Sequence, residues 1–380
     1  MRYGCTIRTL DGATRQLTAV DGHFRPAGEQ VDVEIDGSGW WAVPGLADCH
    51  AHLSGGYQET WDDPGATVER CRANAWAQLE GGVFLVADKG SADDVTLRML
   101  DEPPDRRPEL QMAGRMIANP GGYYGGFATE VDEADLADTV RAAAEARTPA
   151  GTGPQWVKLV GDWPRKGRGA VTNFSEAAMH RAVEVAHAAG CRVAIHAAGP
   201  VTSSLAVAAG VDSIEHGLFL TADDLTALGA RGGAWVPTVT AMEGIRDLLG
   251  ADSSGGRLFA QGLDNVRELL VGAPEAGVTV LAGSDIEVPH GAVATEALGL
   301  GRYGLAPEAV VHAVTDGAYG YLGSDHRFEP GASADVLFFD ADPRDDLSVL
   351  TRPVLGLRHG EVVVGRASSR RAGSWPASRR

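Results

Sequence analysis

The middle of this 380-residue chain alternates short apolar segments with stretches of helical periodicity. Apolar residues in the stretch behind Ser175 recur at i, i+3, i+4 and i+7, with Ser175 as N-cap and Gly190 just past the end, which predicts a helix. Eight apolar segments are predicted to be strands, namely 42–49, 83–88, 110–116, 156–160, 192–196, 211–216, 234–239 and 278–285. Eight strands that each precede a helix predict an α/β fold, a parallel (β/α)8 TIM barrel over residues 43–325.

The two ends of the chain share a different residue pattern. Residues 1–42 alternate apolar and polar positions between Asp-Gly turns, and residues 334–340 and 361–364 again read as short strands. Two short β segments cannot each bury a core, so we expect residues 1–42 and 326–366 to form one composite β-sandwich domain. Residues 367–380 are small, polar and basic, which predicts a disordered tail.

Composition narrows the class of partner. The net charge of −18 and the pI near 5.0 argue against a nucleic acid or an anionic membrane surface, so we expect a small-molecule substrate. The four cysteines show no Cys-x-x-Cys spacing, which fits reduced thiols. Neither a leader sequence nor a membrane span is recognisable, so the expectation is a cytoplasmic protein, with a homo-oligomer as the base-rate assembly.

Residues of the metal-ligand type fall at the ends of the predicted strands. His50 and His52 form a His-x-His pair, and strand alternation points both imidazoles to the same side. Four further residues end other strands: Lys158, His196, His216 and Asp285. Because the carboxyl ends of barrel strands converge on one rim, these six side chains predict a metal site there.

The motifs that carry these residues resemble those of the metal-dependent amidohydrolase superfamily, most closely its imidazolonepropionase-like and prolidase-like branch. The resemblance rests on Pro44-Gly45-Leu46-Ala47-Asp48-Cys49-His50-Ala51-His52, Trp156-Val157-Lys158-Leu159, Val193-Ala194-Ile195-His196, Asp212-Ser213-Ile214-Glu215-His216-Gly217 and Gly283-Ser284-Asp285. The stretch 330–336 also resembles the family's return to its composite sheet domain, so the resemblance spans nearly the whole chain.

The resemblance implies two divalent metal ions bridged by a carboxylated Lys158. One ion would be held by His50, His52, Lys158 and Asp285, and the other by Lys158, His196 and His216. A lysine desolvated near a dication has a depressed pKa, and its neutral amine can react with carbon dioxide. A simple ion pair between Lys158 and Asp285 is the alternative. Zinc is the default metal, while manganese, cobalt or iron also suit nitrogen and oxygen ligands.

The family's chemistry implies hydrolysis of an amide bond in a dipeptide or an N-acyl amino acid. A metal pair lowers the pKa of a bridging water to about 7, and the resulting hydroxide attacks the carbonyl. Asp285 and His216 are the expected catalytic residues, with Asp285 passing the proton from this hydroxide to the leaving group.

The loops that follow the C-terminal ends of the predicted strands are expected to determine substrate specificity. The loop 119–127 offers two phenols, Tyr123 and Tyr124, where many prolidase-like relatives have a histidine. The loop after Lys158 concentrates cations that suit a substrate carboxylate, and the loop after the eighth strand adds a histidine. The further candidate contacts are therefore Arg165, Lys166, Arg168 and His290.

Other functions stay open from the residues alone. One is hydrolysis of a lactone, a cyclic amide or a heteroaromatic carbon–nitrogen bond, as in imidazolonepropionases and deaminases. Another is a catalytically silent barrel that has kept its metal. A substrate panel and the metal content of the purified protein separate these alternatives.

Overall fold

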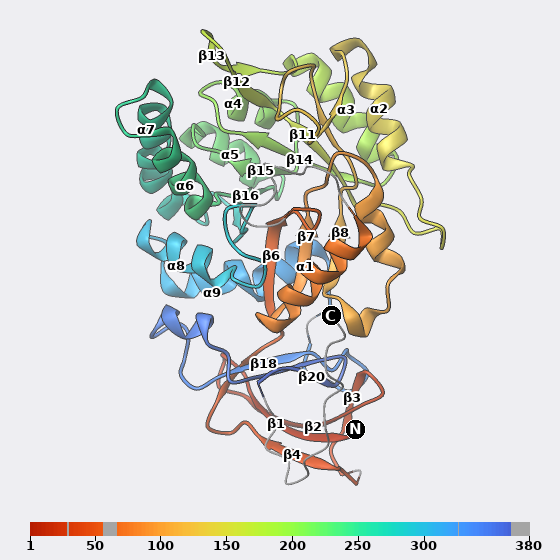
Figure 1. Cartoon of the computed structure of the whole chain (residues 1–380). Coiled ribbons are helices and arrows are strands. Elements are labelled where there is room, and N and C mark those ends of the chain that lie inside the picture. The colour runs from red at the N-terminus through yellow and green to blue at the C-terminus, as the bar shows by residue number, and fades with distance from the viewer. Residues whose placement is uncertain (29, 56–66, 326, 366–380) are drawn as a thin grey trace.

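The computed structural model describes residues 1–28, 30–55, 67–325 and 327–365. Its centre consists of two parallel sheets (Figure 1). The first sheet contains β6 (Leu46–Ala51), β7 (Val83–Asp88) and β8 (Glu109–Met112). The second has the order β10-β9-β11-β14-β15-β16-β17, with β9 (Met116–Ala118), β10 (Thr129–Glu130), β11 (Trp156–Val160), β14 (Arg192–Ala197), β15 (Ser213–His216), β16 (Ala234–Val236) and β17 (Thr279–Val280).

Backbone hydrogen bonds join the two sheets at both margins. The amide of Cys49 in β6 donates to the carbonyl of Ala282 just past β17 at 2.8 Å, and Gln155 before β11 donates to Met112 of β8 at 3.0 Å. Apart from such single bonds, the two sheets are separate and do not form one continuous sheet. The C-terminal ends of both sheets face the same region. That region holds the candidate site.

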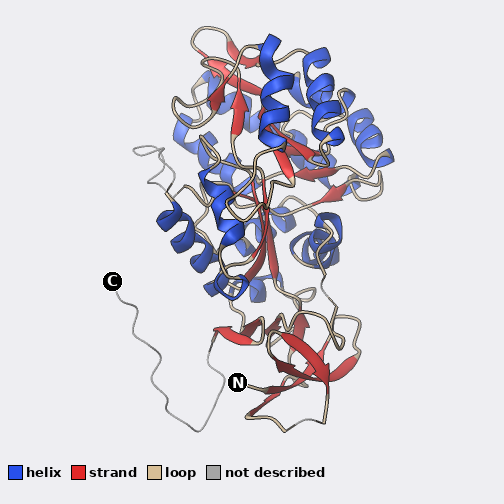
Figure 2. Cartoon of the chain, turned by 90° about the vertical axis from the view of Figure 1, so that its right-hand side faces the viewer, coloured by secondary structure: helices blue, strands red, loops and turns tan. Residues whose placement is uncertain are grey.

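Helices surround the parallel strands (Figure 2). They are α1 (Val68–Glu80), α2 (Leu136–Ala144), α3 (Glu176–Ala188), α4 (Thr202–Ala208), α5 (Ala222–Ala230), α6 (Val239–Leu249), α7 (Ser254–Leu269), α8 (Ala294–Arg302), α9 (Pro307–Val314) and α10 (Asp316–Leu322). The predicted start of α3 is confirmed, because the Ser175 hydroxyl accepts a hydrogen bond from the amide of Ala178. Among the described residues, no helix combines the length and the apolar character needed to cross a bilayer.

Four of the predicted strands differ from the structure. The segment 42–49 is two strands in different sheets, β5 (Trp41–Val43) and β6, separated by Pro44 and Gly45. The segment 110–116 is two strands, β8 and β9, because the chain turns between them at Gly114, where φ is +73°. The segment 234–239 ends as a strand at Val236, and Val239 already begins α6. Of the segment 278–285, only Thr279–Val280 is a strand, and the rest is irregular backbone that presents Asp285 to the site.

The two ends of the chain lie side by side in what we call the terminal β layer, at the bottom of Figure 1. One sheet has the order β3-β2-β1-β4 and the other β20-β19-β18-β5. Its strands are β1 (Tyr3–Arg8), β2 (Thr14–Val20), β3 (His23–Pro26), β4 (Val33–Asp36), β5 (Trp41–Val43), β18 (Val336–Phe339), β19 (Leu355–Arg358) and β20 (Glu361–Val364). Ile7, Phe24, Phe338 and Leu357 from both ends belong to one buried apolar cluster. The domain boundaries stay a prediction, and residues 366–380 lie outside the described residues.

A tight connection links the terminal β layer to the parallel strands. β5 pairs with β18 and leads through Pro44 and Gly45 into β6. Gly45 has φ of +139°, and a Cβ there would lie 2.5 Å from the ring of Phe84. Glycine is therefore required where the chain enters the first strand of the site.

Candidate metal centre

The six predicted ligand residues come from five strand regions, with His50 and His52 both at the end of β6, and the structure brings them toward one region. Within the described residues, one ligand atom each from His50, His216 and Asp285 lies within 4.8 Å of the others. The rings of His50 and His52 have centroids 5.3 Å apart, and those of His196 and His216 have centroids 4.6 Å apart. The predicted convergence of imidazoles at the strand ends is therefore present in the structure.

Three of these histidines have partners that place their proton on Nδ1. His52 Nδ1 lies 2.7 Å from the carbonyl oxygen of Gly90, which can only accept. His50 Nδ1 lies 2.7 Å from a carboxylate oxygen of Glu215; the contact falls outside hydrogen-bond alignment, so its attraction is electrostatic and also requires a proton on Nδ1. Each Nε2 then carries a lone pair.

The third histidine, His216, is oriented by a hydroxyl. Its Nδ1 lies 2.7 Å from Oγ1 of Thr238, and that hydroxyl donates its own hydrogen to the carbonyl of Pro237 at 2.8 Å. Because the hydroxyl hydrogen is already used, Thr238 accepts from His216, and the Nε2 lone pair of His216 is free to bind.

This proton arrangement leaves an unfavourable contact that a cation would relieve. His50 Nε2 and His52 Nε2 are 3.3 Å apart, so two lone pairs face each other. Oδ1 of Asp285 lies 3.9 Å from the first and 3.7 Å from the second, which adds a third acceptor. Acceptors gathered at these distances without a proton between them fit a metal ion.

Lys158 is the second observation that fits a metal centre. Its side chain is buried, and Nζ has no hydrogen-bond partner among the residues that the structure describes. Nor is an ion pair with Asp285 found there, so the alternative of a simple pair is not supported. Burial lowers the pKa of Lys158 to about 8, which favours the neutral amine that carboxylation requires.

The environment also keeps the histidines neutral. Burial, with the charge of Lys158 next, lowers the pKa of His50 and of His52 to about 4. Burial lowers the pKa of His196 to about 3 and that of His216 well below its usual range. Neutral imidazoles are the form that binds metal, so no protons need to leave these rings at neutral pH.

Glu215 and Lys89 belong to the site although the sequence patterns did not indicate them. Glu215 is completely buried, and its Oε1 lies 3.2 Å from Lys89 Nζ and accepts from the Ser213 hydroxyl at 2.7 Å. Burial alone raises the pKa of Glu215, but Lys89, His50 and Lys158 together hold it well below its usual range. The charged carboxylate therefore lies against the Nδ1 side of the His50 ring.

Asp48 supports the segment that carries Asp285. It is buried and accepts from the Ser284 amide at 3.0 Å, the Ser284 hydroxyl at 2.5 Å and Nε2 of Gln78 at 3.1 Å. The amide of Asp285 donates to the carbonyl of His50 at 2.7 Å. The first and the last strand regions of the site are thereby fixed to each other.

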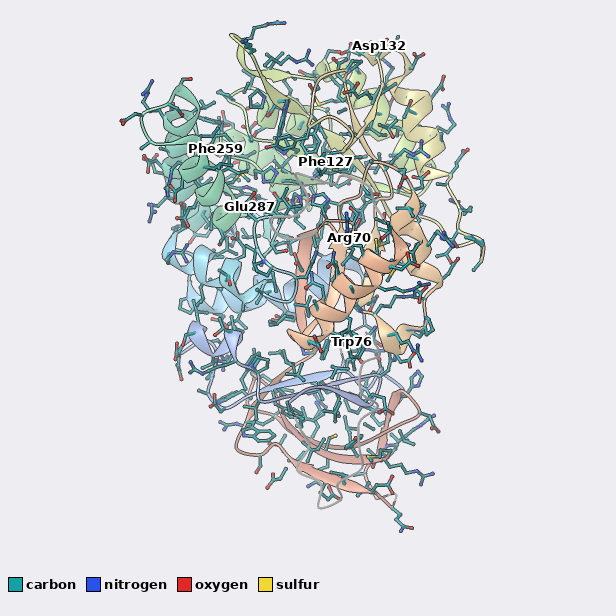
Figure 3. All side chains as sticks on the ribbon, viewed as in Figure 1. Arg70, Trp76, Phe127, Asp132, Phe259 and Glu287 are labelled. Atoms are coloured by element: carbon teal, nitrogen blue, oxygen red, sulfur yellow. The ribbon has the colours of Figure 1, made fainter. Side chains whose placement is uncertain are left out.

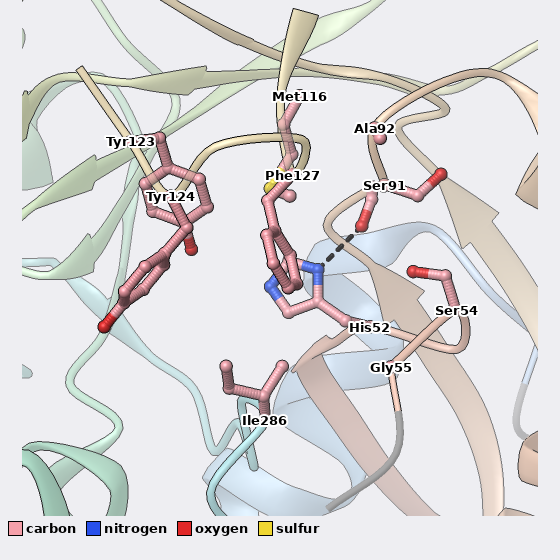
Figure 4. A pocket seen from close by; sticks show the side chains of 11 residues that line it. His52, Ser54, Gly55, Ser91, Ala92, Met116, Tyr123, Tyr124, Phe127 and Ile286 are labelled. Carbon is pink, nitrogen blue, oxygen red and sulfur yellow. Dashed lines mark hydrogen bonds between the residues drawn. The ribbon is translucent and has the colours of Figure 1, made fainter. Parts of the chain in front are cut away.

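A pocket opens beside His52 (Figure 4). Tyr123 and Tyr124 form one side of it and Ile286 another, so the two predicted phenols do lie at the site. Trp163 on β12 (Asp162–Arg165) packs against both tyrosines and was not indicated by the sequence. In Figure 3, Phe127 and Glu287 lie on the side of β6 that faces away from the terminal β layer. The rim of the pocket is therefore on that side of the molecule.

The predicted cationic contacts lie elsewhere. Lys166 and Arg168 are exposed at the tip of the hairpin of β12 and β13 (Gly169–Thr172). Arg165 donates to the side-chain oxygens of Asn119 and Asn173 at 3.1 and 3.3 Å. None of these three cations lines the pocket among the described residues.

His290 is bonded to neighbouring protein groups. Its Nε2 lies 2.8 Å from the carbonyl oxygen of Gly55, and its Nδ1 lies 3.3 Å from the side-chain nitrogen of Gln78. It thus links α1 to the loop that follows His52. Its predicted contact with substrate stays a prediction.

Known proteins are similar to this chain over most of its length. The model of the amidohydrolase family matches residues 41–363. An uncharacterized protein of Mycobacterium tuberculosis is 35% identical over 366 residues, which cover 93% of each chain.

Solved structures are similar over nearly the full length. An Xaa-Pro dipeptidase with bound methionine in its active site has a TM-score of 0.78 at 21% identity, covering 95% of this chain and 99% of that one. A putative prolidase from Bifidobacterium longum has 0.77 at 24%, covering 98% and 96%, and A. niger ochratoxinase has 0.74 at 18%, covering 96% of each. These similarities and the family match indicate a TIM-barrel fold, although the described strands form two parallel sheets and not the single closed barrel that the sequence predicted.

Proposed function

Because the chain belongs to the amidohydrolase family, we propose that it is a metal-dependent hydrolase that cleaves the amide bond of a dipeptide or an N-acylated amino acid. The observation that carries this proposal is the pair of facing Nε2 atoms on His50 and His52, with the carboxylate of Asp285 beside them and the unpartnered amine of Lys158 nearby. Relatives of similar fold include enzymes named for dipeptide hydrolysis, which supports the substrate class.

The residues that would hold two divalent ions are the four histidines, Asp285 and a carboxylated Lys158. Zinc is the proposed metal, because the donors are nitrogen and oxygen atoms. When bound, such ions supply a water with a pKa near 7 and polarise the carbonyl under attack.

The chain's own groups carry the proton. Asp285 lies 3.7 to 4.0 Å from ring nitrogens of His50, His52 and His216, so its carboxylate is placed to accept a proton from the attacking water. The same carboxyl then delivers this proton to the leaving amine. His216 stays oriented by Thr238 throughout, and Tyr123, whose hydroxyl has no hydrogen-bond partner among the described residues, is available to donate to the substrate.

The test combines metal content with hydrolysis. Protein purified without chelator should contain about two zinc equivalents by elemental analysis, and Lys158→Ala should lose much of this metal. Wild type should hydrolyse members of a panel of dipeptides and N-acyl amino acids, and Asp285→Asn should lower kcat by at least about a hundredfold. Asp247→Asn, a change at an exposed aspartate, is the matched control.

Each failure has a distinct meaning. Absence of metal from wild type would overturn the metal centre and favour a silent barrel. Metal together with hydrolysis of only lactones or cyclic amides would overturn the proposed substrate class and keep the metal chemistry.

A further inference from the structure

Four aromatic side chains pack together at the rim of the site, and we call them the aromatic wall: Tyr123, Tyr124, Phe127 and Trp163. The Trp163 ring lies 4.4 Å from the Tyr124 ring and 4.7 Å from the Tyr123 ring, at 69° and 64°. Phe127 lies 5.9 Å from Tyr124 at 63°. These are edge-to-face arrangements, the geometry in which aromatic rings attract one another.

The aromatic wall is continuous with the metal centre. The rings of Tyr123 and Trp163 lie 6.0 and 5.9 Å from the ring of His196. At its other end, the pocket formed with Tyr124 and Phe127 is lined by His52. A substrate group that enters this pocket therefore lies next to the bond that the metal centre would cleave (Figure 4).

Apart from His52, two serines and the two phenols, the described side chains that line the pocket are apolar. Its other side-chain contacts include the apolar groups of Ala92, Met116 and Ile286, and its described lining contains no lysine, arginine or carboxylate. An apolar group loses less hydration than a charged group when it enters such a lining.

We propose that the aromatic wall is a specificity subsite that binds an aromatic side chain or acyl group directly beside the scissile amide. This inference rests on the proposed hydrolysis of dipeptides or N-acyl amino acids and specifies which of them are accepted. Aromatic rings attract one another edge to face, and an apolar group gains from leaving water against these rings.

The experiment is a matched set of substrates on the zinc-loaded protein. Phe, Gly, Asp and Lys are placed on either side of the amide in dipeptides and in N-acetyl or N-benzoyl amino acids. The expected result is that, on at least one side, the aromatic member has kcat/KM at least about tenfold above the glycine member and further above the charged ones. A preference for Asp or Lys, or no preference on either side, would overturn the subsite.

Variants connect the preference to the wall. Phe127→Leu should reduce the preference for Phe over Gly mainly through KM, since the ring is a binding contact. Phe328→Leu makes the same change in the terminal β layer, where Phe328 contacts Phe24, and should leave the preference unaltered. Tyr124→Leu repeats the test at a second position of the wall, and thermal unfolding checks that each variant is folded. An unchanged preference in both wall variants would contradict the proposal.

A binding measurement separates this subsite from the proposed function. Calorimetric titration compares benzohydroxamate with acetohydroxamate, two ligands that differ by the ring. If no amide is hydrolysed, the proposed function fails, but at least tenfold tighter binding of the benzo ligand would still support the subsite. Equal binding of both would overturn it.

Discussion

Three histidines of the site keep their proton on Nδ1 through three different kinds of partner. His52 uses a backbone carbonyl, His216 a threonine hydroxyl and His50 the carboxylate of Glu215. Only the carboxylate carries a charge, and it is itself paired with Lys89. Removing that charge should therefore affect the ligand strength of His50 more than its position.

Glu215→Gln tests this difference. The side chain keeps its size but loses the charge that makes His50 a stronger ligand, and Lys89 loses its buried counter-ion. We expect zinc affinity, measured by competition with a chelator, to fall by about ten- to a hundredfold. Glu243→Gln is the control, because Glu243 pairs with Arg302 outside the site. Equal affinities in the two variants would contradict the role of Glu215.

Lys158 predicts a pH dependence of metal loading. Its pKa lies near 8 instead of above 10, so the neutral amine becomes the major form as pH rises through 8. Carboxylation consumes the neutral form, and bicarbonate-stimulated zinc uptake should therefore increase between about pH 7 and 9. Uptake measured at fixed bicarbonate should lose this dependence in Lys158→Ala. A flat profile in wild type would show that carboxylation does not limit loading.

The positions of the candidate ligand residues were easier to predict from the sequence than those of their supporting partners. His50 and His52 follow strand alternation, which is a local rule. Glu215 and His216 are neighbours, so the same rule turns them to opposite faces. His216 has φ of +66°, which breaks the alternation and lets both residues serve the site. Trp163 was missed because no local pattern shows which loop meets the tyrosines.

Left-handed backbone recurs where three neighbouring segments reach the site. Among non-glycine residues, His216 at the end of β15, Thr238 after β16 and Asp285 after β17 have φ of +66°, +47° and +55°. Each such residue costs about 1–2 kcal/mol relative to ordinary backbone. The backbone at these three segment ends is therefore strained, and this strained conformation directs the side chains toward the site.

Thr238→Gly distinguishes the effect of backbone strain on stability from the effect of the Thr238 hydroxyl on zinc binding. Glycine accepts positive φ, so relief of strain roughly offsets the lost hydrogen bond, of about 1 kcal/mol, and the entropy cost of glycine. We expect urea unfolding to change by less than about 1 kcal/mol, while zinc affinity falls because His216 loses its orienting hydroxyl. Thr238→Ser, which keeps the hydroxyl, should retain the affinity. Loss of affinity in both variants would contradict this reading.

Element boundaries were predictable where an apolar run ends abruptly. The strands at 83–88 and 156–160 agree with β7 and β11 in full. The segment 278–285 was predicted too long: only Thr279–Val280 is a regular strand, and beyond it Leu281 and Ala282 are buried and keep single backbone hydrogen bonds to Trp235 and Cys49. Burial produces the apolar pattern, and burial alone does not specify a hydrogen-bonded ladder.

The whole molecule depends on the packing of its two ends. Phe338 of β18 is completely buried and contacts Trp40, with ring centroids 5.7 Å apart. Strands from both ends contribute to the same apolar cluster. The terminal β layer was predictable from the repeated short alternating segments, whereas its pairing of β5 with β18 was not.

Phe338→Ala measures this dependence. Removing a buried ring leaves a cavity, and the free energy of unfolding should fall by about 3–5 kcal/mol in denaturant titrations. Leu248→Ala is the control, since Leu248 is 77% exposed, and it should change stability by less than about 0.5 kcal/mol. Zinc affinity of folded Phe338→Ala should match that of wild type. A small loss of stability would show that the ends pack independently.

The connection from β5 through Gly45 to β6 also has a consequence for biosynthesis. β5 leaves the ribosome before its partner β18, and all the parallel strands are made between the two. The chain therefore carries His50 and His52 while these strands are made, before the strand that anchors them has its neighbour. Metal capture by this protein is accordingly expected to follow synthesis of β18.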